Sequence, residues 1–134
     1  MSLTTIYCGS DHAGLEMKRL CMHHLQARGW VCVDQGTDTP DSCDYPVFAA
    51  KVCRQVQSTK QLGLLVCGSG LGMSMTANRF TSIRAAVCTN EYLAQMARKH
   101  NNANMLCLGS TIIGPDLALA IVDAFVRTEF DGGR

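Results

Sequence analysis

The stretch LGLLVCGSGLG, residues 62–72, decides the fold of this chain. Its first six residues are apolar throughout, which is typical of a strand that is buried on both faces of a sheet. Closely spaced glycines follow, as they do where a strand turns sharply into a helix. The segment therefore predicts a strand at Leu62–Cys67, a glycine-rich turn at 68–72, and a helix that continues to about Arg79.

Similar patterns alternate on both sides of this stretch. Five β-α units in succession favour parallel strands joined by right-handed crossovers. The sequence therefore predicts an α/β fold, an open three-layer α/β/α sandwich with a five-stranded parallel, Rossmann-like sheet, in which residues 1–134 form a single domain. The other strands are expected at Thr4–Cys8, Trp30–Val33, Arg84–Cys88 and Asn104–Leu108, and the other helices at about 14–28, 46–57, 91–100 and 115–127.

Composition excludes several classes of protein. With 134 residues, 47% of them hydrophobic and 17% charged, the chain fits one compact globular domain. A net charge of +1 leaves no basic face for nucleic acid, and no apolar run approaches the roughly 20 residues that span a membrane. The chain begins without the features of a signal peptide. None of the eight cysteines forms a CxxC pair, so we expect reduced thiols and a cytoplasmic location.

Polar residues at the ends of the predicted strands carry the chemistry, because ligands of open α/β sheets bind there. Cys67 stands between a strand and a helix, where the helix dipole favours a thiolate. The backbone amides of Gly68, Gly70 and Gly72 could converge on an anion, with the Ser69 hydroxyl beside them. A thiolate base facing such donors suits proton abstraction next to a carbonyl. Equally, Cys67 could be one more buried thiol, with glycines that only build the crossover.

Two further polar pairs lie near predicted helix ends. Asp11 could orient a sugar hydroxyl and His12 could contact a phosphate, or Asp11 could simply cap the helix. His100 and Asn101 end a later helix, where capping is again an alternative. A P-loop is absent, and the dinucleotide fingerprint is incomplete because Met73 stands where it requires Gly or Ala. No His, Asp or Glu residues have metal-ligand spacing, so the sequence predicts a site without metal or cofactor.

Six segments of the sequence follow one another in a distinctive order. They are GSDHAG (9–14), DYP (44–46), CGSGLGMSMTANR (67–79), IRAAVC (83–88), HNNAN (100–104) and GGR (132–134). As a set they closely resemble the ribose-5-phosphate isomerase type B family and its galactose- and allose-phosphate isomerase relatives, and the resemblance covers nearly the whole chain. It implies a homodimer with active sites built from both subunits, and interconversion of an aldose phosphate and a ketose phosphate through a cis-enediolate without metal.

The resemblance also implies the substrate. We expect ribose 5-phosphate and ribulose 5-phosphate to be the pair that is interconverted. One alternative is an isomerase of allose or galactose 6-phosphate. Another is a sugar-phosphate-binding module without catalysis, although the presence of Cys67, Ser69 and His100 together disfavours it.

Individual residues match family positions of known role. Cys67 matches the base that moves the proton between C1 and C2, Ser69 the hydroxyl that assists proton movement between the substrate oxygens, and His100 the residue that opens the furanose ring. The turn from Gly68 to Gly72 matches the anion hole. The substrate-contacting matches are Asp11, Tyr45 and Asn101 at the sugar, and His12 and Arg134 at the phosphate. Relative to Cys67, we expect His100, Asn101 and Arg134 to come from the partner subunit.

Two departures from the family pattern concern the phosphate. Many relatives have a basic residue where Thr111 stands, and many continue past Arg134 to a further arginine. Each lost charge-assisted contact would cost about 1.5–3 kcal/mol, so weaker phosphate binding is expected. Arg79, Arg84 or Arg98 could offset the loss.

Overall fold

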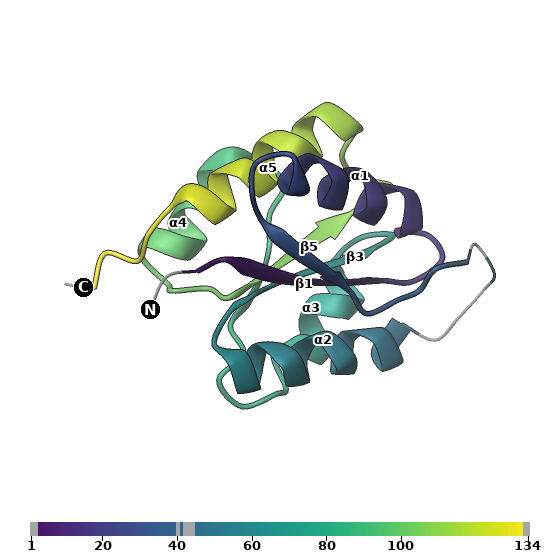
Figure 1. The fold of residues 1–134 in the computed structure, drawn as a ribbon, viewed down its shortest axis with the longest axis horizontal. Coiled ribbons are helices and arrows are strands. Elements are labelled where there is room, and N and C mark those ends of the chain that lie inside the picture. The colour runs from purple at the N-terminus through teal and green to yellow at the C-terminus, as the bar shows by residue number, and fades with distance from the viewer. Residues whose placement is uncertain (1–2, 40, 42–44, 133–134) are drawn as a thin grey trace.

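The computed structural model describes residues 3–39, 41 and 45–132 of the chain. Strands and helices alternate along the described residues, as predicted (Figure 1). They are β1 (Thr5–Ser10), α1 (Leu15–Gln26), β2 (Val31–Asp34), α2 (Tyr45–Thr59), β3 (Leu62–Cys67), α3 (Leu71–Ala77), β4 (Ala85–Val87), α4 (Glu91–Lys99), β5 (Met105–Gly109) and α5 (Pro115–Arg127).

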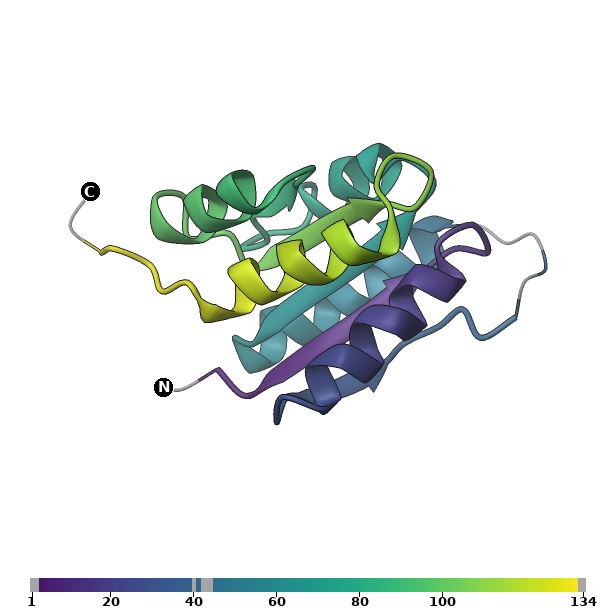
Figure 2. The same ribbon diagram turned by 90° about the horizontal axis from the view of Figure 1, so that it is seen from above.

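The strands form one parallel sheet in the order β2-β1-β3-β5-β4. Helices α1, α4 and α5 cover one face, and α2 and α3 cover the other (Figure 1). Seen from above, α1 and α5 lie side by side over the strands (Figure 2). The predicted α/β fold, a three-layer sandwich around a five-stranded parallel sheet, is confirmed.

Each face of the sheet has its own hydrophobic core. One cluster packs β1, β3 and β5 against α1, α4 and α5, and the other packs the opposite face against α2 and α3. All six residues of β3 are buried, which is the continuous apolar run that the sequence showed. A fully buried Leu or Val side chain contributes about 1.5–3 kcal/mol, so the central strand anchors the fold.

The ends of most elements shift by one or two residues from their predicted positions. Relative to its length β4 changes most among the strands, since it contains three residues, Ala85–Val87, where five were expected. Its predicted first residue, Arg84, gives its N–H to the Asn104 side chain at 2.8 Å, so regular pairing with β5 starts one residue later.

The seven cysteines among the described residues are free thiols, and Cys43 lies outside that set. Within the described ranges, no helix has the length and apolarity needed to cross a membrane.

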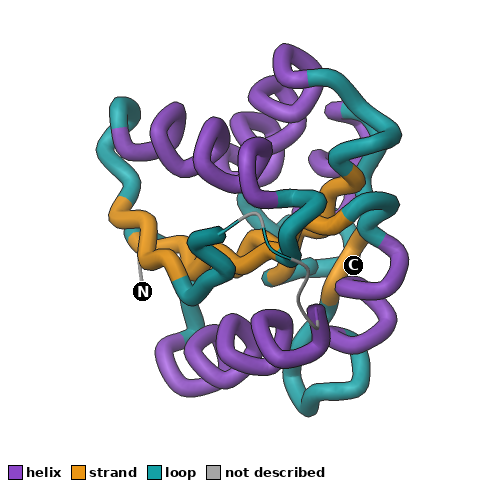
Figure 3. Tube along the Cα trace, turned by 90° about the vertical axis from the view of Figure 1, so that its right-hand side faces the viewer, coloured by secondary structure: helices purple, strands orange, loops and turns teal. Residues whose placement is uncertain are grey.

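All five strands point the same way, so their carboxyl ends meet at one edge of the sheet. Figure 3 shows the sheet between its two helix layers from the side on which these ends emerge. The loops after β1, β2, β3 and β5 therefore lie close to one another.

Candidate active site

Cys67 lies at the point where β3 becomes a tight loop leading into α3. The thiol is only 5% exposed, and its Sγ accepts a hydrogen bond from the Gly70 amide at 3.2 Å. Gly70 has φ +82°, a left-handed conformation that favours glycine. The Ser69 Oγ accepts from the Leu71 amide at 3.1 Å, so the sulfur and the hydroxyl both face backbone N–H groups of the same turn.

The carboxyl end of β5 supports this loop from beneath. Ser110 N donates to the Cys67 carbonyl at 2.8 Å, and Thr111 Oγ1 donates to the Gly68 carbonyl at 2.6 Å. A Cβ on Gly109 would lie 2.5 Å from the Ser69 carbonyl oxygen, closer than any real contact. Glycine at 109 is therefore required for the loop to rest on β5. The Thr111 hydroxyl therefore holds the loop after β3 in place.

The Asp11–His12 loop meets the Cys67 loop at the same edge. Asp11 N donates to the Val66 carbonyl at 3.3 Å, directly before Cys67 in β3. The Asp11 Oδ1 accepts from the Gly14 amide at 3.0 Å, which closes the turn before α1, and the residue is 8% exposed. Gly14 is the N-cap residue of α1 and has no side-chain cap, so Asp11 does not cap the helix, which was the alternative that the sequence left open. His12 is exposed beside it.

Tyr45, the first residue of α2, reaches the same region. Its ring fills the space beside Gly72, where an added Cβ would come within 2.8–3.0 Å of the ring atoms. The phenol is 37% exposed, so it can face both α3 and a bound molecule. The structure thus brings Asp11, Tyr45 and Cys67 to one edge of the sheet.

His100 and Asn101 do not lie at that edge. They end α4, and because the helices run back against the strands, that end lies at the amino edge of the sheet. Both side chains are exposed. Within one chain the predicted catalytic residues are therefore divided between opposite edges, while Arg134 lies outside the described residues.

The arginines that could offset Thr111 have different surroundings. Arg84 donates from Nε to the Asn101 carbonyl at 2.6 Å, which places a cation next to a predicted substrate contact. Arg98 is buried and bonded to the Ala103 and Thr128 carbonyls. Arg79, just after α3, is exposed.

The other thiols near Cys67 are poor candidates for a base. Burial raises the pKa of Cys53 to about 11 and that of Cys88 to about 11. Burial, reinforced by the neighbouring thiols, also raises the pKa of Cys107 well above its ordinary value. These three groups therefore remain protonated thiols near neutral pH. Cys67 differs from them in that its Sγ accepts a hydrogen bond from a backbone amide, that of Gly70.

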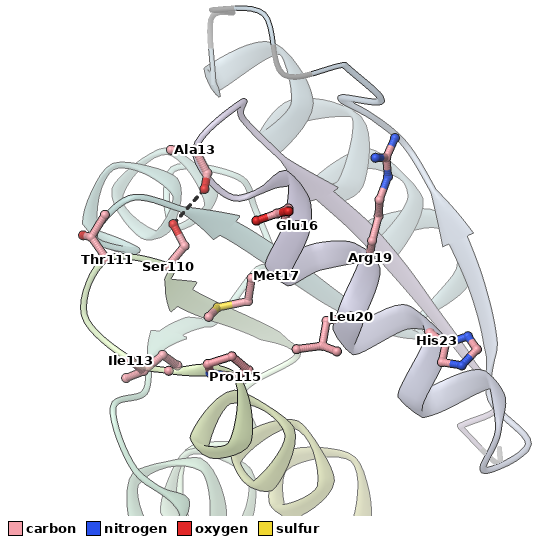
Figure 4. A pocket seen from close by; sticks show the side chains of 11 residues that line it. Ala13, Glu16, Met17, Arg19, Leu20, His23, Ser110, Thr111, Ile113 and Pro115 are labelled. Carbon is pink, nitrogen blue, oxygen red and sulfur yellow. Dashed lines mark hydrogen bonds between the residues drawn. The ribbon is translucent and has the colours of Figure 1, made fainter.

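A groove of about 920 Å³ opens beside these loops, between α1 and the start of α5 (Figure 4). Ala13 and Ser110 meet at its end, where Ser110 Oγ donates to the Ala13 carbonyl at 2.8 Å. Its walls are apolar at Met17 and Ile113 and carry charge at Arg19. The groove borders the loops after β1 and β5, and Cys67 is not part of its lining. Ser110 was not predicted from the sequence to link the loops after β1 and β5, because its position after a strand was the only feature that set it apart from other serines.

The described part of the chain contains no group of three or more His, Cys, Asp and Glu side chains able to hold a metal ion. The functional groups gathered at the carboxyl edge are instead a thiol, hydroxyls, an imidazole, a carboxylate and backbone amides. This set can move protons and stabilise negative charge on an oxygen.

Comparison with known proteins identifies the family. The family described as Ribose/Galactose Isomerase matches residues 6–134. The chain is 42% identical to ribose-5-phosphate isomerase B of Escherichia coli K12 over 127 residues, covering 94% of this chain and 85% of the relative.

Two solved structures show the same similarity. The structure of Clostridium thermocellum ribose-5-phosphate isomerase B superposes with a TM-score of 0.95 at 48% identity, covering 98% of this chain and 89% of that one. The Mycoplasma genitalium enzyme with bound ribulose-5-phosphate gives a TM-score of 0.93 at 40% identity, covering 98% and 88%. This chain therefore belongs to the ribose/galactose isomerase family.

Proposed function

We propose that this protein is a cytoplasmic aldose–ketose isomerase that interconverts D-ribose 5-phosphate and D-ribulose 5-phosphate. The observation that carries the proposal is the loop after β3, where the Cys67 sulfur and the Ser69 hydroxyl lie against backbone amides. Family membership supports the reaction class. The relative with bound ribulose-5-phosphate supports a pentose phosphate as the substrate.

The proposed reaction moves one hydrogen between neighbouring carbons. The Cys67 thiolate removes the proton from C2 of the open-chain aldose, and the electron pair moves to O1 to give a cis-enediolate. The amides of the turn from Gly68 to Gly72 stabilise that oxyanion. Ser69 transfers a proton between O2 and O1, and Cys67 returns its proton to C1, which yields the ketose.

Two copies of the chain would complete the site. In one copy Cys67 and His100 lie at opposite edges of the sheet, so a shared site requires His100, Asn101 and Arg134 of a second subunit. Exposed apolar side chains flank the edge strand β4 and would be buried in such a homodimer. They are Leu71 and Met75 on α3, and Tyr92 and Leu93 on α4.

The remaining residues would bind the substrate. Asp11 and Tyr45, with the partner subunit's Asn101, would contact the sugar. His12 and the partner subunit's Arg134 would contact the phosphate, and the partner subunit's His100 would open the furanose ring.

An isomerisation assay tests the proposal directly. Purified protein treated with a chelator should convert ribose 5-phosphate to ribulose 5-phosphate, because the proposed residues need no metal. Competition between ribose 5-phosphate and allose 6-phosphate separates the two isomerase functions, and preference for the hexose would favour that alternative. Binding without hydrogen exchange between the substrate carbon and solvent would identify a sugar-phosphate-binding module instead.

Mixing two inactive variants tests the shared site. Cys67→Ala and His100→Ala homodimers should each have little activity on cyclic ribose 5-phosphate. After the variants are unfolded and refolded together, random pairing gives half heterodimers, each with one intact site, so about a quarter of wild-type turnover should return. A mixture that stays as inactive as its components would show that both residues act within one chain. Each variant refolded alone is the control.

A further inference from the structure

Lys18 of α1 carries an ammonium group that is buried inside the protein. Its side chain has no exposed surface, and Nζ donates to Asp34 Oδ1 at 2.7 Å and to the Thr37 carbonyl oxygen. A buried ion pair is weak grounds for stability, because an apolar side chain of similar volume is often as stable or more so. The directed contacts of Lys18 therefore need a different explanation from core packing.

The segment that Lys18 holds continues the pairing between β2 and β1 beyond Asp34. Ser10 N donates to the Gly36 carbonyl at 2.8 Å, and Thr37 N donates to the Ser10 carbonyl at 2.9 Å. Gly36 N also donates to Asp34 Oδ1 at 2.9 Å, so one carboxylate oxygen binds both the turn and the ammonium. Lys18 thus contacts both ends of the short turn 34–37.

This turn fixes the peptide unit between Ser10 and Asp11 from one side. The carbonyl of that unit accepts from Thr37 N, and its N–H donates to the Val66 carbonyl at 3.3 Å. The turn held by Lys18 supplies the contact to the carbonyl, and the central strand β3 supplies the contact to the N–H. Because the plane of this unit is held from both sides, the direction in which the Asp11 side chain leaves the backbone is set by Lys18 as well as by β3.

We propose that Lys18 is a positioning residue for substrate binding, which orients Asp11 through Thr37 and the Ser10 carbonyl. The inference rests on the proposed function, in which Asp11 contacts a sugar hydroxyl. In that role Asp11 binds the sugar and takes no part in the proton transfer, so loss of the contact weakens binding of substrate and transition state alike. Removing Lys18 therefore raises KM and leaves kcat nearly unchanged.

The test is Lys18→Met, which keeps much of the side-chain length and removes the ammonium. We expect the KM for ribose 5-phosphate to rise about tenfold or more, with kcat changed less than about threefold. The Thr37 amide should also exchange its hydrogen with solvent faster than in the wild type, measured without substrate.

The matched control is Asp123→Asn, which breaks another ion pair of α1. Asp123 Oδ2 lies 2.9 Å from His24 Nε2, between α1 and α5 and away from the loops. This variant should keep the wild-type KM and the wild-type exchange at Thr37, whatever its effect on Tm. An equal rise in KM in both variants would overturn the proposal, because the effect would then follow from general loosening of α1.

A second variant covers the case in which Lys18→Met does not fold. Asp34 is 37% exposed, so the side chain of Asp34→Asn can be solvated. The asparagine keeps an oxygen that accepts from Gly36 N, but it removes the charge that pairs with the Lys18 ammonium. It should raise KM about threefold and speed exchange at Thr37. Wild-type values for both quantities would overturn the proposal. If the wild-type protein does not isomerise ribose 5-phosphate, the proposed function fails, while exchange at Thr37 still decides whether Lys18 fixes the segment.

Discussion

Replacing Cys67 with alanine should lower turnover of ribose 5-phosphate by about 10²- to 10⁴-fold, the range that a positioned general base contributes. The sulfur is the group that moves the proton in the proposed reaction, and the pKa values of the neighbouring thiols keep them protonated near neutral pH. Exchange of the substrate C2 hydrogen with deuterated solvent should stop in the variant. Steady-state kinetics and NMR measure the two effects.

Cys53→Ala is the control for this substitution. Cys53 lies on α2 and is fully buried. Cys53→Ala removes the same sulfur atom as Cys67→Ala, so this variant reports the packing cost of the substitution alone. It should keep wild-type turnover. The fold of Cys67→Ala should be intact by circular dichroism. Retained turnover in a folded Cys67→Ala protein would refute the assignment of the base.

Replacing Gly109 with alanine should disable the site without removing any functional group. The added Cβ would lie within 2.5–2.9 Å of three backbone atoms of Ser69, and backbone cannot move aside as a flexible side chain can. Overpacking of this kind costs about 1–3 kcal/mol of stability. Displacing the loop by about 1 Å should lower kcat/KM about a hundredfold. Thermal unfolding and kinetics check the two expectations.

Gly114→Ala provides the comparison. An added Cβ at Gly114 meets nothing within 4 Å, and φ of −84° suits alanine. Gly114 is the N-cap residue of α5, where alanine is less favourable than glycine, so stability should fall by about 0.5–1 kcal/mol, with unchanged kinetics. If Gly109→Ala behaves like Gly114→Ala, the loop does not depend on its support by β5.

Periodicity and glycine spacing were enough to predict the order of the elements and the layers of the fold. These features depend on local sequence, because a continuous apolar run such as Leu62–Cys67 is stable only where both faces of the strand are buried, at the centre of a sheet. The meeting of Asp11 with the Cys67 loop also followed from the sequence, since parallel strands end at one edge. Element ends were less predictable, as Arg84 shows, because a side chain twenty residues away takes its amide.

Other features depend on contacts that a sequence pattern does not contain. A lysine at position 18 suggests a solvated helix face, yet its partners Asp34 and Thr37 lie sixteen and nineteen residues away. The need for glycine at 109 arises only when β5 meets the loop after β3. His100 lies at the opposite edge because α4 runs antiparallel to the strands. Its role in the proposed site cannot follow from one chain, because that site includes a second subunit.

The loop that bears Cys67 rests on β3, the central strand, and on its neighbour β5, and every residue of both strands is buried. Edge strands such as β2 and β4 can open and close in local fluctuations that leave this centre untouched. We therefore expect local opening at the edges to leave the backbone around the thiol in place. Substitutions in the edge strands can therefore change the surroundings of the site while the loop of the proposed base, Cys67, keeps its geometry.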